Sequence, residues 1–379
     1  MKKRASVGLI VFLMALVVLA SVTMKIQYDH LKVTERIRPR ELMQKQFKTS
    51  IAALPRGIVE STTDMEMKSL WNVSNLKDSN VNFSGLLAIA VGISQKRNVD
   101  SMVRKFLADY CSIILFHYDG NVNGWQDLGW TDKAIHILAQ NQTKWFAKRF
   151  LHPDVVALYD YIFLWDEDIG VDYFNPGRYM QIIFSEGLEI SQPAVDPEFS
   201  SDIHHRITVR NRKTKVHRRV YFCGSVNCSN ESKGPPCTGW VEGMVPVFSK
   251  SAWRCVWHLI QNDLIHGWGL DMKLGYCAQG DRTKNVGVID TEFIIHQGIP
   301  LDCHVIAGSC ICQGCVPFTD VACYLLSWHA EEATAQKSLD SRSRIRRQST
   351  AELEKFKERW NKAVEEDRDW IDPFDLQKR

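Results

Sequence analysis

The feature that most restricts the fold is an alternation of apolar, strand-length segments with helical patterns. Residues 85–93 and 111–120 are apolar runs closed by turn-forming residues, which is typical of strands buried on both faces. Residues 97–110 have apolar side chains at helical spacing, and 144–159 repeat a helical pattern that Pro153 interrupts. Buried strands separated by helices predict an α/β fold with a mostly parallel sheet flanked by helices. Two further strands are predicted at 187–195 and 205–210. Residues 239–260 begin as an extended stretch and become helical near Lys250.

The strand predicted at 161–165 runs directly into three acids, Asp166, Glu167 and Asp168, and Asp119 ends the preceding strand. Ligands bind beyond the carboxyl ends of parallel strands, so these acids fall where a binding site is expected. Residues i and i+2 of a strand share a face roughly 6.5 Å apart, which places Asp166 and Asp168 together and Glu167 on the opposite face. Two such carboxylates suit one Mg²⁺ or Mn²⁺ with a bound phosphate. A solvated acidic loop is the alternative. A glycosidase pair is less favoured, because its carboxylates flank the scissile bond from two sides.

The first 24 residues indicate a membrane anchor. Three basic residues at 2–4 precede an uncharged apolar run at 5–24. Twenty helical residues span about 30 Å, the thickness of the hydrocarbon core. We therefore expect a cytoplasmic tail at 1–4, a single transmembrane signal-anchor helix at 5–24 and a stem or linker at 25–81. A cleaved signal peptide with a small-residue site at 18–20 is the alternative.

Both alternatives place the rest of the chain in the secretory pathway, and we expect a single-pass type II protein of a Golgi or similar membrane with a lumenal C-terminus. The 11 cysteines are compatible with disulfides in that compartment, and reduced cysteines in the cytosol are the alternative if the first segment is neither an anchor nor a signal. The net charge of +3 is too weak to indicate nucleic acid binding. Five Asn-x-Ser/Thr sequons also suit the compartment, at Asn72, Asn82, Asn141, Asn227 and Asn230.

The acids after the apolar strand resemble the Asp-x-Asp motif of metal-dependent glycosyltransferases with the GT-A fold. The resemblance implies Mn²⁺ or Mg²⁺ bound by Asp166 and Asp168, and a nucleotide-diphosphate sugar as donor substrate. Gly-Trp-Gly before Asp271 is similar to the loop that supplies the general base for an acceptor hydroxyl in inverting members. His296 follows a strand-like run, where many members place an imidazole as third metal ligand. The alternatives are that Asp271 caps a helix and that His296 is structural.

Further donor contacts follow from the same resemblance. Asp119 is a candidate ribose or base contact, and Lys144, Lys148 and Arg149 are candidate diphosphate contacts. For the three basic residues a solvated helix face is the alternative.

A longer stretch, from residue 86 to about 374, resembles a plant family of unknown function, often labelled lysine-ketoglutarate reductase trans-splicing related. The resemblance rests on segments such as YDYIFLWDEDIGVDYF, GLEISQPA, GWVEGMVPVFSKSAW and GWGLDMKLGYCAQGD. The label itself is uninformative, because no Gly-x-Gly-x-x-Gly of a dinucleotide site follows the first strand.

The resemblance places a GT-A-like catalytic domain at 82–300 and leaves two segments after it. Residues 332–379 are highly charged with a narrow apolar stripe, and predict a helical segment that docks on the domain. Residues 301–331 form a Cys-rich insert that departs from the family. A zinc site, disulfides and a gene-model error are the alternatives for its cysteines, Cys303, Cys310, Cys312, Cys315 and Cys323.

Together these patterns predict a membrane-anchored glycosyltransferase that uses a nucleotide-diphosphate sugar and a divalent cation, with a glycan or glycoprotein as acceptor. The alternative is a non-catalytic, membrane-anchored binding or scaffold protein that retains the fold.

Overall fold

A computed structural model describes residues 21, 23–25, 54–58, 83–201, 203, 205–223, 226–298, 305–306, 309–310 and 324–375. The chain divides into two units, Met1–Thr49 and Ser50–Arg379. In the first unit the described residues are helical, at Ser21 and Thr23–Lys25. Across the described ranges, no helix combines the length and apolarity needed to cross a membrane. The predicted anchor at 5–24 lies almost wholly outside these ranges and stays a prediction.

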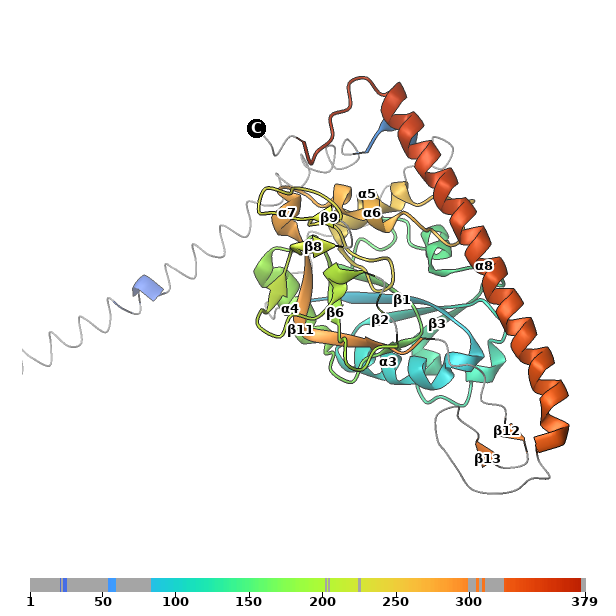
Figure 1. The fold of residues 1–379 in the computed structure, drawn as a ribbon. Helices are drawn as coiled ribbons and strands as arrows, with labels where there is room; N and C mark the ends of the chain where they lie inside the picture. The colour runs from blue at the N-terminus through green and yellow to red at the C-terminus, as the bar shows by residue number, and fades with distance from the viewer. Residues whose placement is uncertain are drawn as a thin grey trace, which may run out of the picture. The chain divides into compact units, whose positions relative to one another are not determined.

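The second unit is an α/β fold built on a nine-stranded mixed sheet (Figure 1). Its strand order is β3-β2-β1-β4-β10-β6-β11-β5, and β7 pairs with β11. The strands of the sheet are β1 (Gly85–Val91), β2 (Ser112–His117), β3 (Ala134–Leu138), β4 (Tyr161–Trp165), β5 (Ile169–Gly170), β6 (Ile190–Val195), β7 (Val216–His217), β10 (Val247–Ser249) and β11 (Val286–His296). Two short pairs lie outside it, β8 (Phe222–Cys223) with β9 (Val226–Asn227) and β12 (Val305–Ile306) with β13 (Ser309–Cys310).

Strands β3, β2, β1 and β4 are parallel neighbours, and so are β6 and β11. Between these groups β10 runs antiparallel to both β4 and β6. The expectation of a mostly parallel sheet is thus corrected to a mixed one, because an antiparallel strand of three residues joins its two halves. Because β10 is antiparallel to both β4 and β6, β4 and β6 run in the same direction. Strand β11 is parallel to β6, so the carboxyl ends of β4 and β11 lie at the same edge of the sheet.

The α-helices are α3 (Lys96–Ala108), α4 (Pro176–Glu186), α5 (Lys250–Leu259), α6 (Asp271–Leu274), α7 (Arg282–Asn285) and α8 (Tyr324–Glu366). The 3-10 turns used below are η2 (Arg56–Ile58), η4 (Ile93–Gln95), η7 (Lys144–Arg149) and η8 (Arg206–Thr208).

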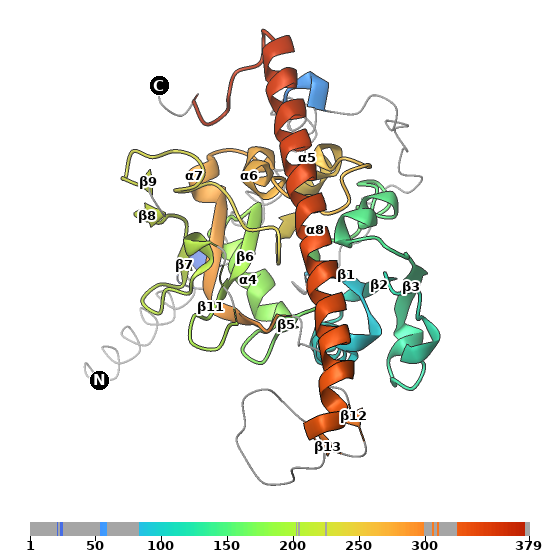
Figure 2. The ribbon, with the colours of Figure 1, turned by 45° about the vertical axis from the view of Figure 1, so that its right-hand side comes forward.

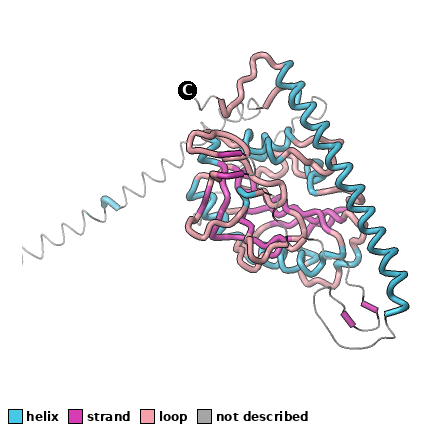
Figure 3. The backbone as a smooth tube through the Cα atoms, in the orientation of Figure 1, coloured by secondary structure: helices cyan, strands magenta, loops and turns pink. Residues whose placement is uncertain are grey.

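Two hydrophobic cores lie on the two faces of the sheet, and β1 contributes to both because its side chains alternate. Leu86 and Ala88 belong to the core shared with α5 and α8. Leu87 and Ile89 belong to the core shared with α3 and α4. Figure 3 shows the helices on either side of the strands. All seven residues of β1 are buried, which explains why this strand reads as a continuous apolar run rather than an alternating one.

Helix α8 extends along the outside of this unit (Figure 2). Phe356, Trp360 and Ala363 are buried in the core it shares with α5. Its first residue, Tyr324, lies inside the predicted insert 301–331, so the segment expected to intervene already contains the start of the helix. The predicted cysteines of the insert lie outside the described side chains.

The predicted stem at 25–81 also requires a correction. Leu54 and Ile58 are 2% and 1% exposed in the same core, and η2 contacts α8. Gln261 donates a hydrogen bond to the carbonyl of Ile58. Residues 54–58 therefore pack as part of the globular unit, because Leu54 and Ile58 are buried in the core to which α8 also contributes.

Two secondary-structure predictions were wrong. The helix expected at 144–159 is limited to η7, after which the chain forms turns around Pro153, whose ring is incompatible with a continuing helix. The strand expected at 205–210 is η8 followed by a single bridge between Val209 and Val195. Five or six alternating residues do not distinguish a strand from an irregular edge segment.

Among the cysteines that the structure describes, two disulfides are formed, Cys228–Cys237 and Cys255–Cys277. The second joins α5 to the segment after α6 within the buried core. Cys111 is a buried thiol, and burial raises its pKa to about 12.

Helix α5 provides a test of local stabilisation. The hydroxyl of Ser249 accepts a hydrogen bond from the amide of Ala252, so Ser249 is the N-cap. We expect Ser249→Ala to lower the free energy of unfolding by about 1 kcal/mol, because an amide donor loses its partner. Ser249→Gly should lower it by less than Ser249→Ala, since glycine is tolerated at this position. Urea unfolding of both variants measures the difference, and equal stability of the parent and Ser249→Ala would refute the assignment.

Candidate active site

The acidic turn begins where β4 ends. The amide of Asp166 donates to the carbonyl of Met244 at 3.0 Å, which continues the β4–β10 pairing by one residue. The ammonium of Lys144, in η7, donates to the carboxylate of Asp166 at 2.9 Å and to the carbonyl of Met244 at 3.0 Å. Lys144 is 5% exposed, whereas the Asp166 side chain is 37% exposed. The buried ammonium thus holds one oxygen of Asp166 while the carboxylate keeps access to solvent.

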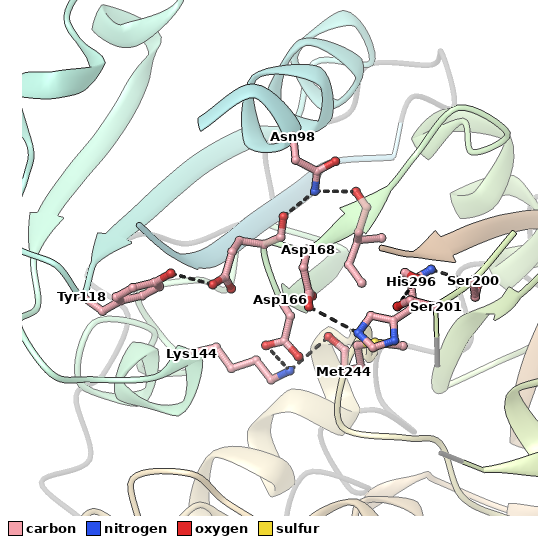
Figure 4. A network of polar contacts seen from close by, with 11 residues as sticks. Asn98, Tyr118, Lys144, Asp166, Asp168, Ser200, Ser201, Met244 and His296 are labelled. Atoms are coloured by element: carbon pink, nitrogen blue, oxygen red, sulfur yellow. Dashed lines mark hydrogen bonds and ion pairs between the residues drawn. The ribbon is translucent and has the colours of Figure 1, made fainter. Parts of the chain in front are cut away.

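Asp168 and His296 meet across the sheet edge (Figure 4). The imidazole Nε2 of His296 lies 3.3 Å from a carboxylate oxygen of Asp168. His296 is the last residue of β11 and pairs with Ile169 of β5, the residue after Asp168. Its backbone is fixed by the hydroxyl of Ser200, which accepts from the His296 amide, and by Ser201, whose amide and hydroxyl donate to the His296 carbonyl. Residues 128 positions apart in the sequence are thereby brought together.

Glu167 is held on the other side of the turn. Its carboxylate accepts a hydrogen bond of 2.8 Å from the hydroxyl of Tyr118, and Asn98 of α3 donates to the carbonyls of Glu167 and Ile169. Gly92 makes this possible, because a Cβ there would lie 2.5 Å from the Tyr118 hydroxyl. The absence of a side chain after β1 lets Tyr118 reach across to the acidic turn.

Asp119 lies at the carboxyl end of β2, as predicted. Its carboxylate accepts from the amide of Ile93 at 2.7 Å and from the amide of Asn121 at 2.9 Å. It therefore ties the end of β2 to the turn after β1, and the rest of the exposed carboxylate faces solvent. A role as a ribose or base contact stays a prediction.

Asp271 is the first residue of α6 and lies near the same group. One carboxylate oxygen accepts from the amide of Met272 at 2.9 Å, and the other lies 4.0 Å from Nε2 of His205. A Cβ on Gly243 would be 3.8 Å from Asp271 and 3.8 Å from Trp145, so Gly243 separates the two. Met244 next to Gly243 provides the carbonyl that Lys144 binds. Asp271 thus flanks the loop that also borders Asp166.

The structure adds Glu242 to this group. It is buried, and its amide donates to the side-chain oxygen of Gln192. Burial, together with the nearby charges of Asp271 and Asp166, raises the pKa of its carboxyl. The sequence carried one signal for Glu242, an acid inside the apolar segment GWVEGMV, but no spacing rule links it to the acids at 166–168.

Lys148 and Arg149 are not part of the group. The Lys148 ammonium donates to the carbonyl of Ile260 at 2.6 Å and lies 4.7 Å from the centroid of Trp257. The Arg149 guanidinium lies 5.3 Å from the centroid of Phe146 at an exposed position. Of the three predicted diphosphate contacts, the structure brings Lys144 alone to the acids.

The acids share an unusual electrostatic environment. Burial raises the pKa of Glu167 to about 8 and that of Glu242 to about 7, and neighbouring carboxylates add to both shifts. Burial also raises the pKa of Asp271, and the nearby charges of His205 and Lys144 partly offset that rise. The cause is an excess of carboxylates over cations in a desolvated region, which favours a bound cation or a retained proton.

The residues fit a divalent cation in donor type and charge. Asp166 and Asp168 offer carboxylate oxygens and His296 an imidazole nitrogen, a set that Mn²⁺ accepts. Among the residues that the structure describes, no three His, Cys, Asp or Glu side chains are already arranged around one metal position. The side chains therefore match a divalent cation in the type of donor atom and in charge, but they are not arranged around a common position.

The raised pKa of Glu167 predicts a pH dependence of stability in the absence of divalent cations. Between its ordinary pKa of 4.5 and the folded value of about 8, the native state holds a proton that the unfolded state releases. Stability from this group is therefore greatest below pH 4.5 and is lost as the pH rises to 8. Between pH 5 and pH 8 the free energy of unfolding should therefore fall by roughly 1–3 kcal/mol less in Glu167→Gln than in the parent.

Urea unfolding in EDTA at pH 5 and pH 8 measures this effect. Glu358→Gln, at an exposed position of α8, is the matched control and should behave as the parent. An unchanged pH dependence in Glu167→Gln would show that the carboxyl titrates normally in the folded protein.

No protein of curated function matches the chain in sequence. Solved structures with partial similarity are those of S. aureus TarS 1-349, of GalNAc-T7 with UDP, GalNAc and Mn²⁺, and of the mannosyltransferase Ktr4p from S. cerevisiae. Their identities to this chain are 7%, 13% and 9%, with TM-scores of 0.38, 0.37 and 0.22. The matches cover 57%, 59% and 42% of this chain but only 60%, 45% and 51% of the respective structures. TM-scores this low are too small for the likenesses to carry an argument.

The family comparison is extensive. A family model described as "Protein of unknown function (DUF707)" matches residues 45–366, which includes the acidic turn, Asp271, His296 and all of α8. It begins well before the resemblance expected from residue 86, in agreement with the packing of residues 54–58. The reductase-related label is not part of this finding. The chain belongs to the DUF707 family of proteins of unknown function.

Proposed function

We propose that this protein is a glycosyltransferase that uses a nucleotide-diphosphate sugar and a divalent cation at the turn 166–168. The observation that carries the proposal is the meeting of Asp168 with His296 at 3.3 Å, beside Asp166 and its partner Lys144. Three residues that the GT-A resemblance implies as metal ligands thus lie at one edge of the sheet, beyond the carboxyl ends of β4 and β11. Ligands of α/β sheets bind at such an edge.

Each residue has a distinct role in this proposal. Asp166, Asp168 and His296 would hold Mn²⁺ or Mg²⁺, which when bound neutralises a diphosphate leaving group. Lys144 holds one oxygen of Asp166 and adds a fixed positive charge next to the donor. Asp271 would accept the proton of an acceptor hydroxyl while the hydroxyl oxygen bonds to the sugar carbon and the diphosphate departs. Its raised pKa suits a proton acceptor, because a carboxylate in a desolvated position is a stronger base.

The location in the secretory pathway belongs to the proposal. The disulfides Cys228–Cys237 and Cys255–Cys277 support an oxidising compartment. Asn141 and Asn230 begin sequons at exposed positions, as glycosylation in that compartment requires. We propose a single-pass type II protein of a Golgi-type membrane, with the segment at 5–24 as anchor.

One observation favours the alternative of a non-catalytic binding or scaffold protein. Asp166 already has an ion pair with Lys144, and Asp168 already contacts His296. A protein that had lost metal binding could keep this arrangement as a purely internal network.

Screening nucleotide sugars separates the two functions. The glycosyltransferase proposal predicts that at least one nucleotide-diphosphate sugar binds in the presence of Mn²⁺, is hydrolysed slowly without acceptor, and is neither bound nor hydrolysed in EDTA. Asp271→Asn should retain Mn²⁺-dependent binding and lose hydrolysis. The absence of Mn²⁺-dependent binding for all common nucleotide sugars would favour the scaffold function.

A further inference from the structure

A cavity of about 530 Å³ lies between the end of α3, the loop from β5 to α4, and β11. Its volume falls within the range of about 300–1,000 Å³ that is typical of ligand sites. The two segments that carry Asp168 and His296 continue into its wall, which contains Tyr173 and Phe293. The cavity is thus a separate site built from the chain segments of the proposed active site.

An aromatic platform forms one wall of the cavity. The rings of Tyr173 and Phe293 are stacked, with centroids 4.8 Å apart and planes at 14°. The guanidinium of Arg210 lies 3.4 Å from the centroid of Phe293 and fixes that ring further. Phe293 is 8% exposed, but Tyr173 is 51% exposed. A rigid, exposed tyrosine offers a large amphipathic contact surface whose ordering requires little further entropy.

Two charged residues that line the cavity, Lys105 and Asp109, stabilise the loop from β5 to α4. The ammonium of Lys105 donates to the carbonyls of Val171, Asp172 and Phe174. The carboxylate of Asp109 accepts from the amide of Gly177 at 3.2 Å. All three donors of the Lys105 ammonium are therefore directed at the loop that carries Tyr173 and not at the cavity.

The charges around the cavity also cancel. Among its lining residues the cations Lys105 and Arg178 are balanced by the carboxylates Asp109 and Asp172. Arg178 is further paired with Glu292, with its Nε 2.9 Å from the carboxylate. A site for phosphate or a nucleotide would have an excess of positive charge, which this wall lacks.

Polar groups at the rim remain able to bond a ligand. The side chains of Asp172 and Thr291 are exposed, and Arg178 is 67% exposed. They provide an acceptor, a hydroxyl and N–H donors around an aromatic face. A hydroxyl-rich ligand with an apolar ring face and no net charge matches this set.

We propose that the cavity binds neutral carbohydrate, with a sugar ring stacked on Tyr173 and its hydroxyls bonded by Asp172, Thr291 and Arg178. Its assignment as the subsite for an acceptor glycan rests on the proposed function, because the adjoining segments carry Asp168 and His296. The binding of sugar itself does not depend on turnover, metal or donor.

The test measures sugar binding without donor or metal. The full chain, kept in a detergent without a sugar head group, is examined by saturation-transfer NMR and calorimetry. The probes are individual neutral oligosaccharides of glucose, galactose, mannose or xylose, with UDP and inorganic phosphate as charged comparisons. We expect at least one neutral oligosaccharide to bind, and Tyr173→Ala to weaken it on the order of tenfold. Tyr221→Ala, at a position 64% exposed elsewhere, should leave its binding unchanged.

The same variants separate this proposal from the proposed function. Asp168→Asn should keep oligosaccharide binding and lose Mn²⁺-dependent binding of UDP, whereas Tyr173→Ala should show the reverse. If the parent binds an oligosaccharide but shows no Mn²⁺-dependent binding of UDP, the proposed glycosyltransferase function is wrong and the proposal of a carbohydrate-binding cavity stands. Three results would overturn the cavity proposal: no binding of any neutral oligosaccharide, binding of unchanged affinity in Tyr173→Ala, or binding of the charged probes alone.

Discussion

Asp168→Asn is expected to abolish the rise in melting temperature that Mn²⁺ with UDP gives the parent protein. A ligand that binds the native state at 100 times its dissociation constant stabilises it by about 2.7 kcal/mol, which corresponds to a shift of a few degrees in a chain of this size. Replacing a carboxylate by an amide removes the charge that holds the cation and leaves the side-chain volume unchanged. An amide can still form a hydrogen bond with the imidazole of His296, so the stability of the metal-free variant should remain close to that of the parent.

Asp166→Asn should lose the same thermal shift but also some stability without metal. It removes the partner of Lys144, whose ammonium is 5% exposed and would be left with the Met244 carbonyl. A buried charge without its partner destabilises the native state, so Asp168→Asn is the cleaner variant. Asp132→Asn, at an exposed position before β3, is the control and should keep the full shift. Equal shifts in the parent and both variants at the turn would mean that Asp166 and Asp168 hold no cation.

Removing the disulfide Cys255–Cys277 is expected to have the second large effect. The two cysteines are 22 residues apart. A crosslink of that span lowers the conformational entropy of the unfolded chain and so stabilises the native state by about 3 kcal/mol. Both sulfurs are fully buried, so the double Cys→Ala variant also leaves unfilled space in the core. We expect its free energy of unfolding to fall by at least about 3 kcal/mol.

The second disulfide provides the comparison. Cys228 and Cys237 are only nine residues apart, and Cys228 is partly exposed, so their double Cys→Ala variant should lose less stability. Guanidinium unfolding of both double variants gives the two values. If neither variant, nor the parent after reduction, unfolds more easily than the oxidised parent, the disulfides do not stabilise the protein and no longer support an oxidising compartment.

The elements that could be predicted from the sequence are those whose pattern is long or continuous. Strands β1, β2 and β4 and helix α3 were identified because they are buried on both faces or have one apolar face. Strand β10 could not be recognised as antiparallel, because its three residues carry no signal of direction. The start of α8 was also missed, since residues 324–331 were assigned to the insert before the predicted helical segment.

The candidate site was predictable where its residues end strands. Asp166 and Asp168 follow β4, so the rule on carboxyl ends pointed to them. His296, the last residue of β11, was a candidate because of the GT-A resemblance. Lys144 and Lys148 could not be told apart, because the direction of each side chain depends on the 3-10 turn η7 and on the packing of Trp257. Glu242 was missed, since its place beside Asp271 follows from the loop around Gly243 rather than from any local pattern.

The most direct test of the proposed metal site is electron paramagnetic resonance of Mn²⁺ bound to the full chain in the presence of UDP. We predict one protein-bound Mn²⁺ per chain, with a nitrogen coupling from a single imidazole. That coupling should vanish in His296→Gln, and protein-bound Mn²⁺ should be lost in Asp168→Asn. A parent protein that leaves Mn²⁺ in the same state as UDP alone, or an imidazole coupling that persists in His296→Gln, would contradict the site.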